Sequence, residues 1–294
     1  MAAKTDTAYG RKASVKKAGA RLSASSVAAG LVGKAILIVF GVLIMLFVLL
    51  MIMPIISLLQ FSGLTRIWQS VVQSDGLAAI SLSLYSTAIT AAFTFCVGTP
   101  VAFLLSRYRR LKTVRILSLI CQLPIALPPS IAGIGLLLFF GVNGIGGHIL
   151  SALGIGVVFT PIAVMIAQFF VSCPLYVQSL RVSVNAVPEE LFEAAYVNGA
   201  DSIKTIALFI IPMLRPAIVS AIVVSYIRSL GEFGATLLFA GNMSGITSTM
   251  PLHIYTLMQS DVRLSAGFSI VLICVATGIV VLFRALLGRE EHTS

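Results

Sequence analysis

The sequence predicts an all-α membrane protein with about six transmembrane helices, and composition and loop charge are the two observations that predict it. Of the 294 residues, 58% are hydrophobic and only 10% are charged, and the mean hydropathy is +1.05. A soluble domain of this length would be far less apolar. Lys and Arg outnumber Asp and Glu by 20 to 10, but they gather between the apolar runs. This pattern indicates a lipid bilayer as the partner, and no nucleic acid.

Six apolar segments are each close to the ~20 residues that cross the hydrocarbon core of a bilayer. We expect all of them to be helices, because an open sheet edge leaves backbone groups unsatisfied in lipid. The expected helices cover residues 35–59, 78–105, 116–140, 157–180, 217–240 and 265–287. The domain limits that follow are an N-terminal arm (1–34), a first helix with its outer loop (35–77), a main transmembrane domain (78–287) and a tail (288–294).

Loop charge predicts the orientation of these helices. Seventeen Lys and Arg residues lie before the first segment, after the second, after the fourth and in the tail, whereas only Arg66 and Arg263 lie in the opposite loops. Cytoplasmic loops carry the excess of Lys and Arg in membrane proteins. Both termini and the loop after the fourth segment are therefore expected in the cytoplasm, and the protein is expected to cross the cell membrane several times.

The arm at residues 1–34 has two interpretations. It is rich in Ser, Ala and Lys and nearly free of acidic residues, which is also the composition of an organellar transit peptide. Because its charge continues the cytoplasmic pattern, we favour a disordered, basic cytoplasmic arm that sets topology. The apolar run that follows exceeds the core of a cleaved signal peptide.

No constellation for catalysis, metal binding or a cofactor is visible in the sequence. Cys96, Cys121, Cys173 and Cys274 each lie inside an apolar segment without a CxxC pair, and the three His residues are scattered. Residues 30–35 contain a Gly-Lys pair, but a phosphate-binding loop needs four residues between its glycines and Ser or Thr after the lysine. We therefore expect no enzyme activity and no cofactor in this chain, and any energy must come from a partner.

The cytoplasmic loop at 185–212 has the features of a helix-turn-helix. Pro188 suits a first helical turn, Asn198-Gly199 can end that helix, and Asp201 can cap a second helix that ends at Pro212. Small residues in the turn permit close approach by another protein. On these grounds alone a solvated connector and a docking element are equally good interpretations.

This loop resembles the EAA signature of ABC importer permeases. The signature lies in Glu193, Ala194 and Ala195, followed by Gly199 and then a proline. Two longer runs, at residues 123–147 and 231–255, are similar to molybdate and tungstate permeases, and sulfate permeases share much of the second run.

The resemblance implies the ABC transmembrane type-1 (MetI-like) fold. It also implies a homodimer, two cytoplasmic ABC ATPase subunits and an external oxyanion-binding protein. The residues expected to couple to the ATPase are Glu193, Ala194, Ala195, Gly199 and Asp201. The alternatives are a sulfate/thiosulfate ABC permease and, in another class, a secondary transporter or channel that needs no ATPase.

The third and fifth segments hold the candidates for the translocation pathway. Pro128 and Pro129 precede Ser130 in the third segment, which either lines the pathway or is only a kinked packing helix. Arg228 and Glu232 are spaced i,i+4 in the fifth, so they can pair and leave little net charge. Whether this pair lines the pathway or only supports structure at the cytoplasmic mouth stays open. Gly234 and Thr236 are expected at the gate with Ser130, because short side chains let helices slide.

Overall fold

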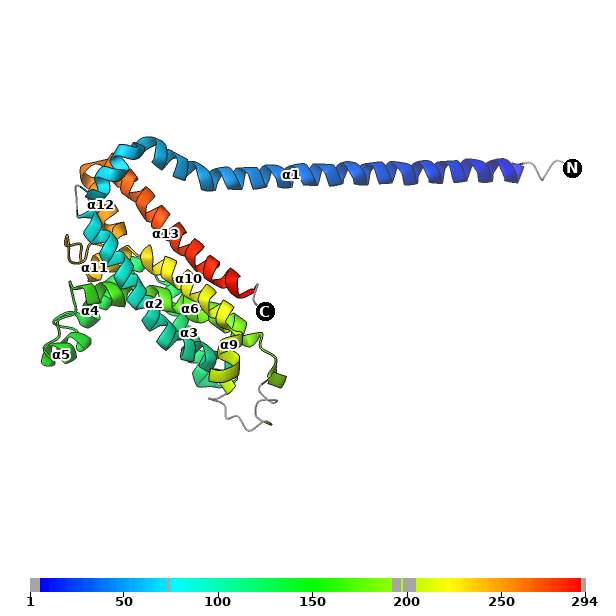
Figure 1. Ribbon diagram of the computed structural model, residues 1–294. Coiled ribbons are helices and arrows are strands. Elements are labelled where there is room, and N and C mark those ends of the chain that lie inside the picture. The colour runs from blue at the N-terminus through cyan, green and yellow to red at the C-terminus, as the bar shows by residue number, and fades with distance from the viewer. Residues whose placement is uncertain (1–5, 73–74, 192–196, 198–204, 292–294) are drawn as a thin grey trace. The chain divides into compact units, whose positions relative to one another are not determined.

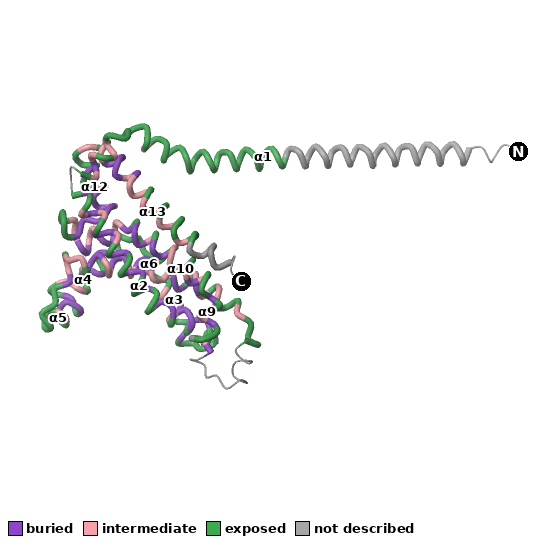
Figure 2. The backbone as a smooth tube through the Cα atoms, in the orientation of Figure 1, coloured by how far each residue is buried: buried purple, intermediate pink, exposed green. Residues whose placement is uncertain are grey.

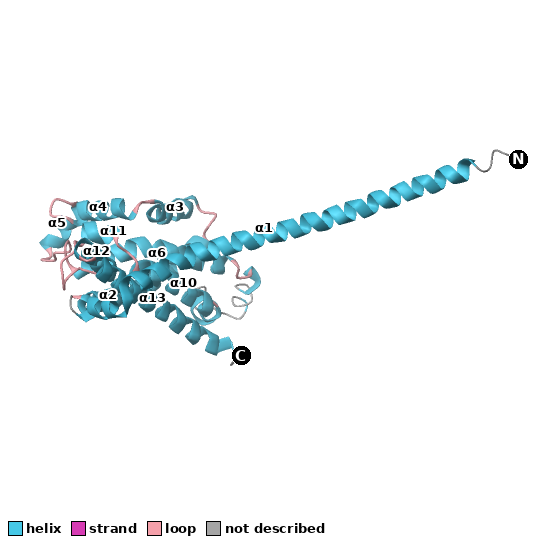
Figure 3. Cartoon of the chain, turned by 90° about the horizontal axis from the view of Figure 1, so that it is seen from above, coloured by secondary structure: helices cyan, strands magenta, loops and turns pink. Residues whose placement is uncertain are grey.

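The computed structural model describes residues 6–72, 75–191, 197 and 205–291, and every regular element in these ranges is helical. Figures 1 and 3 show the helices and the loops between them. Two units are distinguished, residues 1–57 and residues 58–294. The all-α class predicted from the sequence is therefore confirmed.

The part of the first unit that the structure describes is the early part of α1 (Asp6–Val72), which contains residues 6–34 of the basic arm and residues 35–57 of the first predicted apolar segment. Residues 6–34 are helical, in place of the disordered arm expected from the sequence. Residues 36–57 are all exposed in Figure 2. An exposed apolar helix of this length needs lipid or another protein to cover it. Within the second unit, α1 bends at Gly63, whose φ of 67° is a left-handed conformation that glycine adopts readily.

The second unit is built around three helices that pack on one another: α2 (Gly76–Arg107), α6 (Pro161–Asn185) and α10 (Arg215–Leu230). Their shared core contains the fully buried side chains of Tyr176 and Leu180. Polar side chains also join α2 to α6, since the Gln168 amide donates to the Thr87 hydroxyl at 3.2 Å and the Thr90 hydroxyl donates to the Gln168 carbonyl oxygen at 3.2 Å. Such bonds hold membrane helices together where hydrophobic burial gives little preference.

The other helices flank this centre. They are α3 (Lys112–Ala126), α4 (Pro129–Phe140), α5 (Ile145–Ala152), η1 (Ile206–Ile210), α9 (Ile211–Met213), α11 (Gly234–Phe239), α12 (Met250–Ser260) and α13 (Val262–Glu291). Helix α11 packs on α4, and α12 packs on α13. Figure 1 shows α5, α11 and α12 at one end of this unit and α9 at the other.

The predicted spans are recovered with two differences. Among the described residues, four helices are long and apolar enough to cross a membrane: residues 36–72, α2, α6 and residues 262–285. The third predicted segment is a pair, α3 and α4, bent by 113°. The bend has a local cause, because Pro128 forces Leu127 into an extended conformation with ψ of 133°. The fifth predicted segment is also divided, into α10 and the short α11.

Candidate functional site

The fifth predicted segment is interrupted close to its two charged residues, Arg228 and Glu232. Helix α10 ends at Leu230, and the Gly231 N–H still bonds to the Ile227 carbonyl at 3.1 Å. Glu232 and Phe233 then cross to α11, which starts at Gly234. Glu232 therefore lies beyond the end of α10, and the expectation of one continuous helix carrying both charges is wrong.

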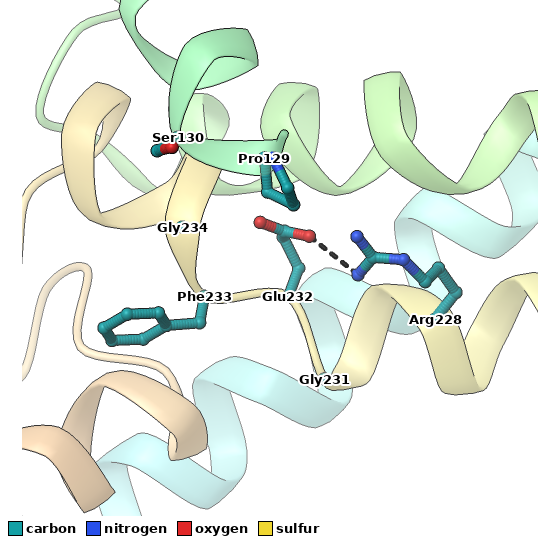
Figure 4. Close-up of a pocket in the computed structure, with 7 residues that line it drawn as sticks. All are labelled: Pro129, Ser130, Arg228, Gly231, Glu232, Phe233 and Gly234. Atoms are coloured by element: carbon teal, nitrogen blue, oxygen red, sulfur yellow. Dashed lines mark hydrogen bonds and ion pairs between the residues drawn. The ribbon is translucent and has the colours of Figure 1, made fainter. Parts of the chain in front are cut away.

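The predicted pairing of Arg228 with Glu232 is nevertheless present. The Arg228 Nη1 atom lies 2.7 Å from Glu232 Oε2, and the dashed line in Figure 4 marks this ion pair. The other carboxylate oxygen, Oε1, accepts the N–H of Ala235 at 2.8 Å. The carboxylate thus joins the last turn of α10 to the first turn of α11, where a negative charge is favourable.

The two charged side chains of this pair differ in exposure. The Glu232 side chain is 1% exposed, whereas the Arg228 side chain is 31% exposed. A guanidinium carries five N–H donors, and one nitrogen of Arg228 is bound to Glu232. The surface next to this pair therefore presents N–H donors, while the buried carboxylate keeps the local net charge near zero.

The start of α4 closes the other side of this region. A pocket of about 410 Å³ is lined by Pro129, Ser130, Arg228, Gly231, Glu232, Phe233 and Gly234. We call it the break pocket, because both of its walls are interruptions in helices (Figure 4). A Cβ atom at Gly234 would lie 3.2 Å from both Pro129 Cβ and Ser130 N. The two chain breaks therefore meet at near-contact distance.

The break pocket brings together most of the residues predicted for the pathway. Ser130, Pro129, Arg228, Glu232 and Gly234 all line it. The remaining two do not. Pro128 precedes the first turn of α4, and Thr236 is fully buried in α11, with a hydroxyl that has no hydrogen-bond partner among the described residues.

Sequence reasoning missed Phe233 as a lining residue. Its ring lies 5.4 Å from that of Tyr255, centroid to centroid. The signal was its place directly after Glu232 in the run at 231–255, where an aromatic residue interrupts a series of small ones.

The predicted coupling residues Glu193, Ala194, Ala195, Gly199 and Asp201 lie outside the described residues. The structure does describe both sides of that loop. Before it, Arg107 Nη1 lies 3.0 Å from Glu189 Oε1, which ties the end of α2 to the loop. After it, the helical turns of η1 and α9 run to Met213, one residue past the predicted end at Pro212.

Among the described residues, no group of three or more His, Cys, Asp or Glu side chains is placed to hold a metal ion. The four cysteines are free thiols. The arrangement of the break pocket is suited to contact with an anion through N–H groups, and the polar side chains that line it include no nucleophile paired with a base.

Comparison with known proteins identifies the family of this chain. Residues 98–288 match the family model described as the binding-protein-dependent transport system inner membrane component. The chain is 47% identical over 240 residues to the probable transport system permease protein NifC of Clostridium pasteurianum, covering 82% of this chain and 84% of that one.

Two further relatives are named as transport system permease proteins. The molybdenum transport system permease protein ModB of Mycobacterium bovis is 36% identical over 228 residues, covering 78% of this chain and 86% of that one. The sulfate transport system permease protein CysT of Salmonella typhimurium is 31% identical over 216 residues, covering 74% and 77%.

A solved structure shares the fold. A bacterial ABC transporter involved in the import of the acidic polysaccharide alginate matches with a TM-score of 0.65 at 20% identity, covering 84% of this chain and 92% of that one. This likeness confirms the predicted type-1 fold of ABC importer permeases. The chain belongs to the family of binding-protein-dependent transport system inner membrane components and is a membrane permease subunit.

Proposed function

We propose that this chain forms the translocation pathway of an ATP-driven importer for molybdate or tungstate, and that the break pocket is part of the pathway. The observation that carries the proposal is the pairing in that pocket, where a partly exposed Arg228 is neutralised by a buried Glu232. Helix breaks in membrane proteins are tolerated where they are buried in protein or line a watery cavity.

The chemistry of the pocket suits passage of a tetrahedral dianion. Guanidinium N–H groups bind oxyanions well. An unpaired arginine would hold a dianion in a deep energy well, whereas conduction requires binding that is weak enough for release. Glu232 weakens the attraction without removing the donors. Selectivity would then reside mainly in the external binding protein.

The choice of substrate rests on the relatives. The 36% identical protein is named for molybdenum transport and the 31% identical protein for sulfate transport. We therefore place molybdate or tungstate first and sulfate or thiosulfate second. The test is uptake of each labelled oxyanion into proteoliposomes that contain the permease, its ATPase and its binding protein. Calorimetric titration of the binding protein with molybdate, tungstate and sulfate ranks the three.

Energy is supplied by two ATPase subunits that hold the EAA loop on the cytoplasmic side. The alternative of a secondary transporter is tested directly. Uptake by an ATP-driven importer must stop when ATP or the ATPase is left out, whereas uptake by a secondary transporter must continue. Gly199→Val should uncouple ATP hydrolysis from uptake, because a β-branched residue resists the left-handed conformation expected at that turn. Normal uptake by this variant would show that the loop is not the coupling element.

We further propose a homodimer whose gate includes α11 and the start of α4. Alternating access needs elements with two packings, each favoured by a different ligand state. Thr236 is fully buried, so the single cysteine is placed at the exposed Ser130, in a background without Cys96, Cys121, Cys173 and Cys274. It should cross-link between the two copies to different extents with and without trapped ATP. Equal cross-linking in both states removes the start of α4 from the moving gate.

A further inference from the structure

A second pocket is lined by residues at the start of α2, in the loop before α12 and in α12 itself. Figure 1 shows α12 at the end of the 58–294 unit that is opposite α9. The pocket has a volume of about 500 Å³, and its polar lining residues are Asp75, Asn242, Ser244, Ser248, His253 and Thr256. We call it the outer pocket. It shares no lining residue with the break pocket.

Hydrogen bonds fix the walls of the outer pocket. The Ser244 hydroxyl donates to the Asp75 carboxylate, which joins the loop before α12 to the start of α2. The Asn242 amide nitrogen donates to the Thr256 hydroxyl at 2.8 Å. The Met250 N–H donates to the buried Ser83 hydroxyl at 2.7 Å, which anchors the first turn of α12 on α2. Two segments that are far apart in the sequence therefore form one rigid wall.

The outer pocket is negatively charged and rich in acceptors. Asp75 is the only Asp, Glu, Lys or Arg residue among the described side chains that line it. His253 is 5% exposed, and burial lowers the pKa of its imidazole, although the nearby Asp75 acts in the opposite direction. The imidazole is therefore neutral at pH 7. The buried carbonyl oxygen of Asn242 has no hydrogen-bond partner among the described residues.

The other charged residues at this end are already engaged. Arg66 and Asp261 form a salt bridge at 3.3 Å, and the Arg263 guanidinium lies over the Phe61 ring at 5.7 Å. None of these four residues lines the outer pocket. An oxyanion would be repelled by Asp75, so this pocket is not suited to the transported ion. A cationic group with several N–H donors would satisfy both Asp75 and Asn242.

We propose that the outer pocket receives a lysine or arginine side chain of the external binding protein when that protein docks. The inference rests on the proposed function, which places this end outside the membrane and supplies the partner. A basic side chain that enters a preformed acidic pocket fixes how the two proteins align, and it makes the interface electrostatically complementary. Asp75 then acts as a docking residue, separate from the pathway.

The test measures docking directly. The permease with its ATPase is reconstituted in nanodiscs, and the affinity of the molybdate-loaded binding protein is measured at several salt concentrations. Asp75→Asn removes the charge and keeps an acceptor for Ser244. We expect about a tenfold weaker affinity, equivalent to about 1.4 kcal/mol. The difference should shrink as salt is added, because salt screens charges near the surface.

Asp261→Asn is the matched control, since it removes a carboxylate at the same end but outside the pocket. The affinity of the binding protein for this variant should stay within about twofold of wild type, because the Asp261 charge is already paired with Arg66 and such pairs near the surface contribute little. An equal decrease for Asp261→Asn overturns the proposal, because the effect would then come from the general field of the surface. Unchanged affinity for Asp75→Asn overturns it as well.

A charge reversal extends the test to the partner. Asp75→Lys should abolish docking, and replacing the matching lysine or arginine of the binding protein by Glu should restore it. ATP hydrolysis without binding protein should equal that of wild type, which shows that the variant is folded. Failure of every such replacement to restore docking contradicts a specific contact. If the wild-type complex itself binds no binding protein, the proposed function is wrong and this inference with it.

Discussion

Two helix contacts in the second unit are built in different ways. Helices α2 and α6 are held together by packed side chains, among them the buried Tyr176 ring, and by side-chain hydrogen bonds, such as the 2.6 Å bond between Thr99 and Tyr176. Helices α4 and α11 instead approach backbone to backbone. A Cβ atom at Gly133 would lie 2.8 Å from the Ala235 carbonyl oxygen.

A glycine in each contact shows what this difference means. In α2, a Cβ atom at Gly98 would meet the ring of Tyr176 at 2.6 Å. A crowded side chain can change its rotamer at modest energy, whereas a crowded backbone can move only if its whole helix moves. Contacts made through small residues also allow membrane helices to slide. The α2–α6 contact is therefore suited to stability, and the α4–α11 contact is suited to motion.

The largest effect is expected where a bulky side chain enters the α4–α11 contact. Gly234→Leu must displace Pro129 or Ser130, since even a Cβ atom would lie 3.2 Å from both. It should jam one of the two proposed packings and reduce uptake more than tenfold, without preventing formation of the proposed homodimer. Uptake in proteoliposomes and size-exclusion chromatography measure the two properties.

Gly135→Leu provides the control for that substitution. Gly135 lies in α4, the helix whose first turn Gly234 meets, but a Cβ atom there meets nothing within 4 Å. We expect near-normal uptake. If both leucine variants lose uptake equally, added bulk in α4 or α11 is harmful for a general reason, and the contact between the breaks has no special part in transport.

The second effect concerns the charges that flank the same contact. Glu232→Gln leaves the Arg228 guanidinium without its counter-ion in a partly buried site. Removing one partner of a fully buried pair typically destabilises by about 3–5 kcal/mol; the effect should be smaller here, because the Arg228 side chain is 31% exposed. Uptake should fall about tenfold as release of the dianion slows.

The double variant Arg228→Met with Glu232→Gln should recover part of that lost uptake, because it removes the uncompensated charge. The comparison needs both single variants and the double variant in the same proteoliposome preparation. Strictly additive defects would show that the two side chains act independently in transport, in spite of their 2.7 Å contact.

Much of the helical fold could be predicted because it depends on local sequence. An apolar run of ~20 residues marks a span regardless of its neighbours, and the prolines at 128 and 129 signalled an interruption that the structure resolves as a sharp bend. The division of the fifth segment could not be predicted in this way. The i,i+4 spacing of Arg228 and Glu232 fits a continuous helix equally well, and the second hydrogen bond of Glu232, to Ala235, follows from the break itself.

The break pocket and the outer pocket also differ in how far the sequence predicts them. Five of the seven predicted pathway residues meet in the break pocket, because the sequence points both to the prolines of the third segment and to the charged pair of the fifth. The outer pocket gave no such signal. Asp75 and Ser244 are 169 positions apart in the chain, and neither belongs to a pattern that predicts contact. Only the packing of α12 on the start of α2 brings them together.

The smallest effect is expected in the α2–α6 contact. Tyr176→Phe removes the hydroxyl that bonds Thr99 at 2.6 Å and keeps the ring in its buried place. Side-chain hydrogen bonds between membrane helices average only about 0.6 kcal/mol, because the separated helices also find partners. Thermal unfolding in detergent should show a slightly lower midpoint, and uptake should stay within about twofold of wild type. A large loss of uptake with unchanged thermal stability would mean that α2 and α6 also move during transport, and the distinction between a stable contact and a mobile one would fail.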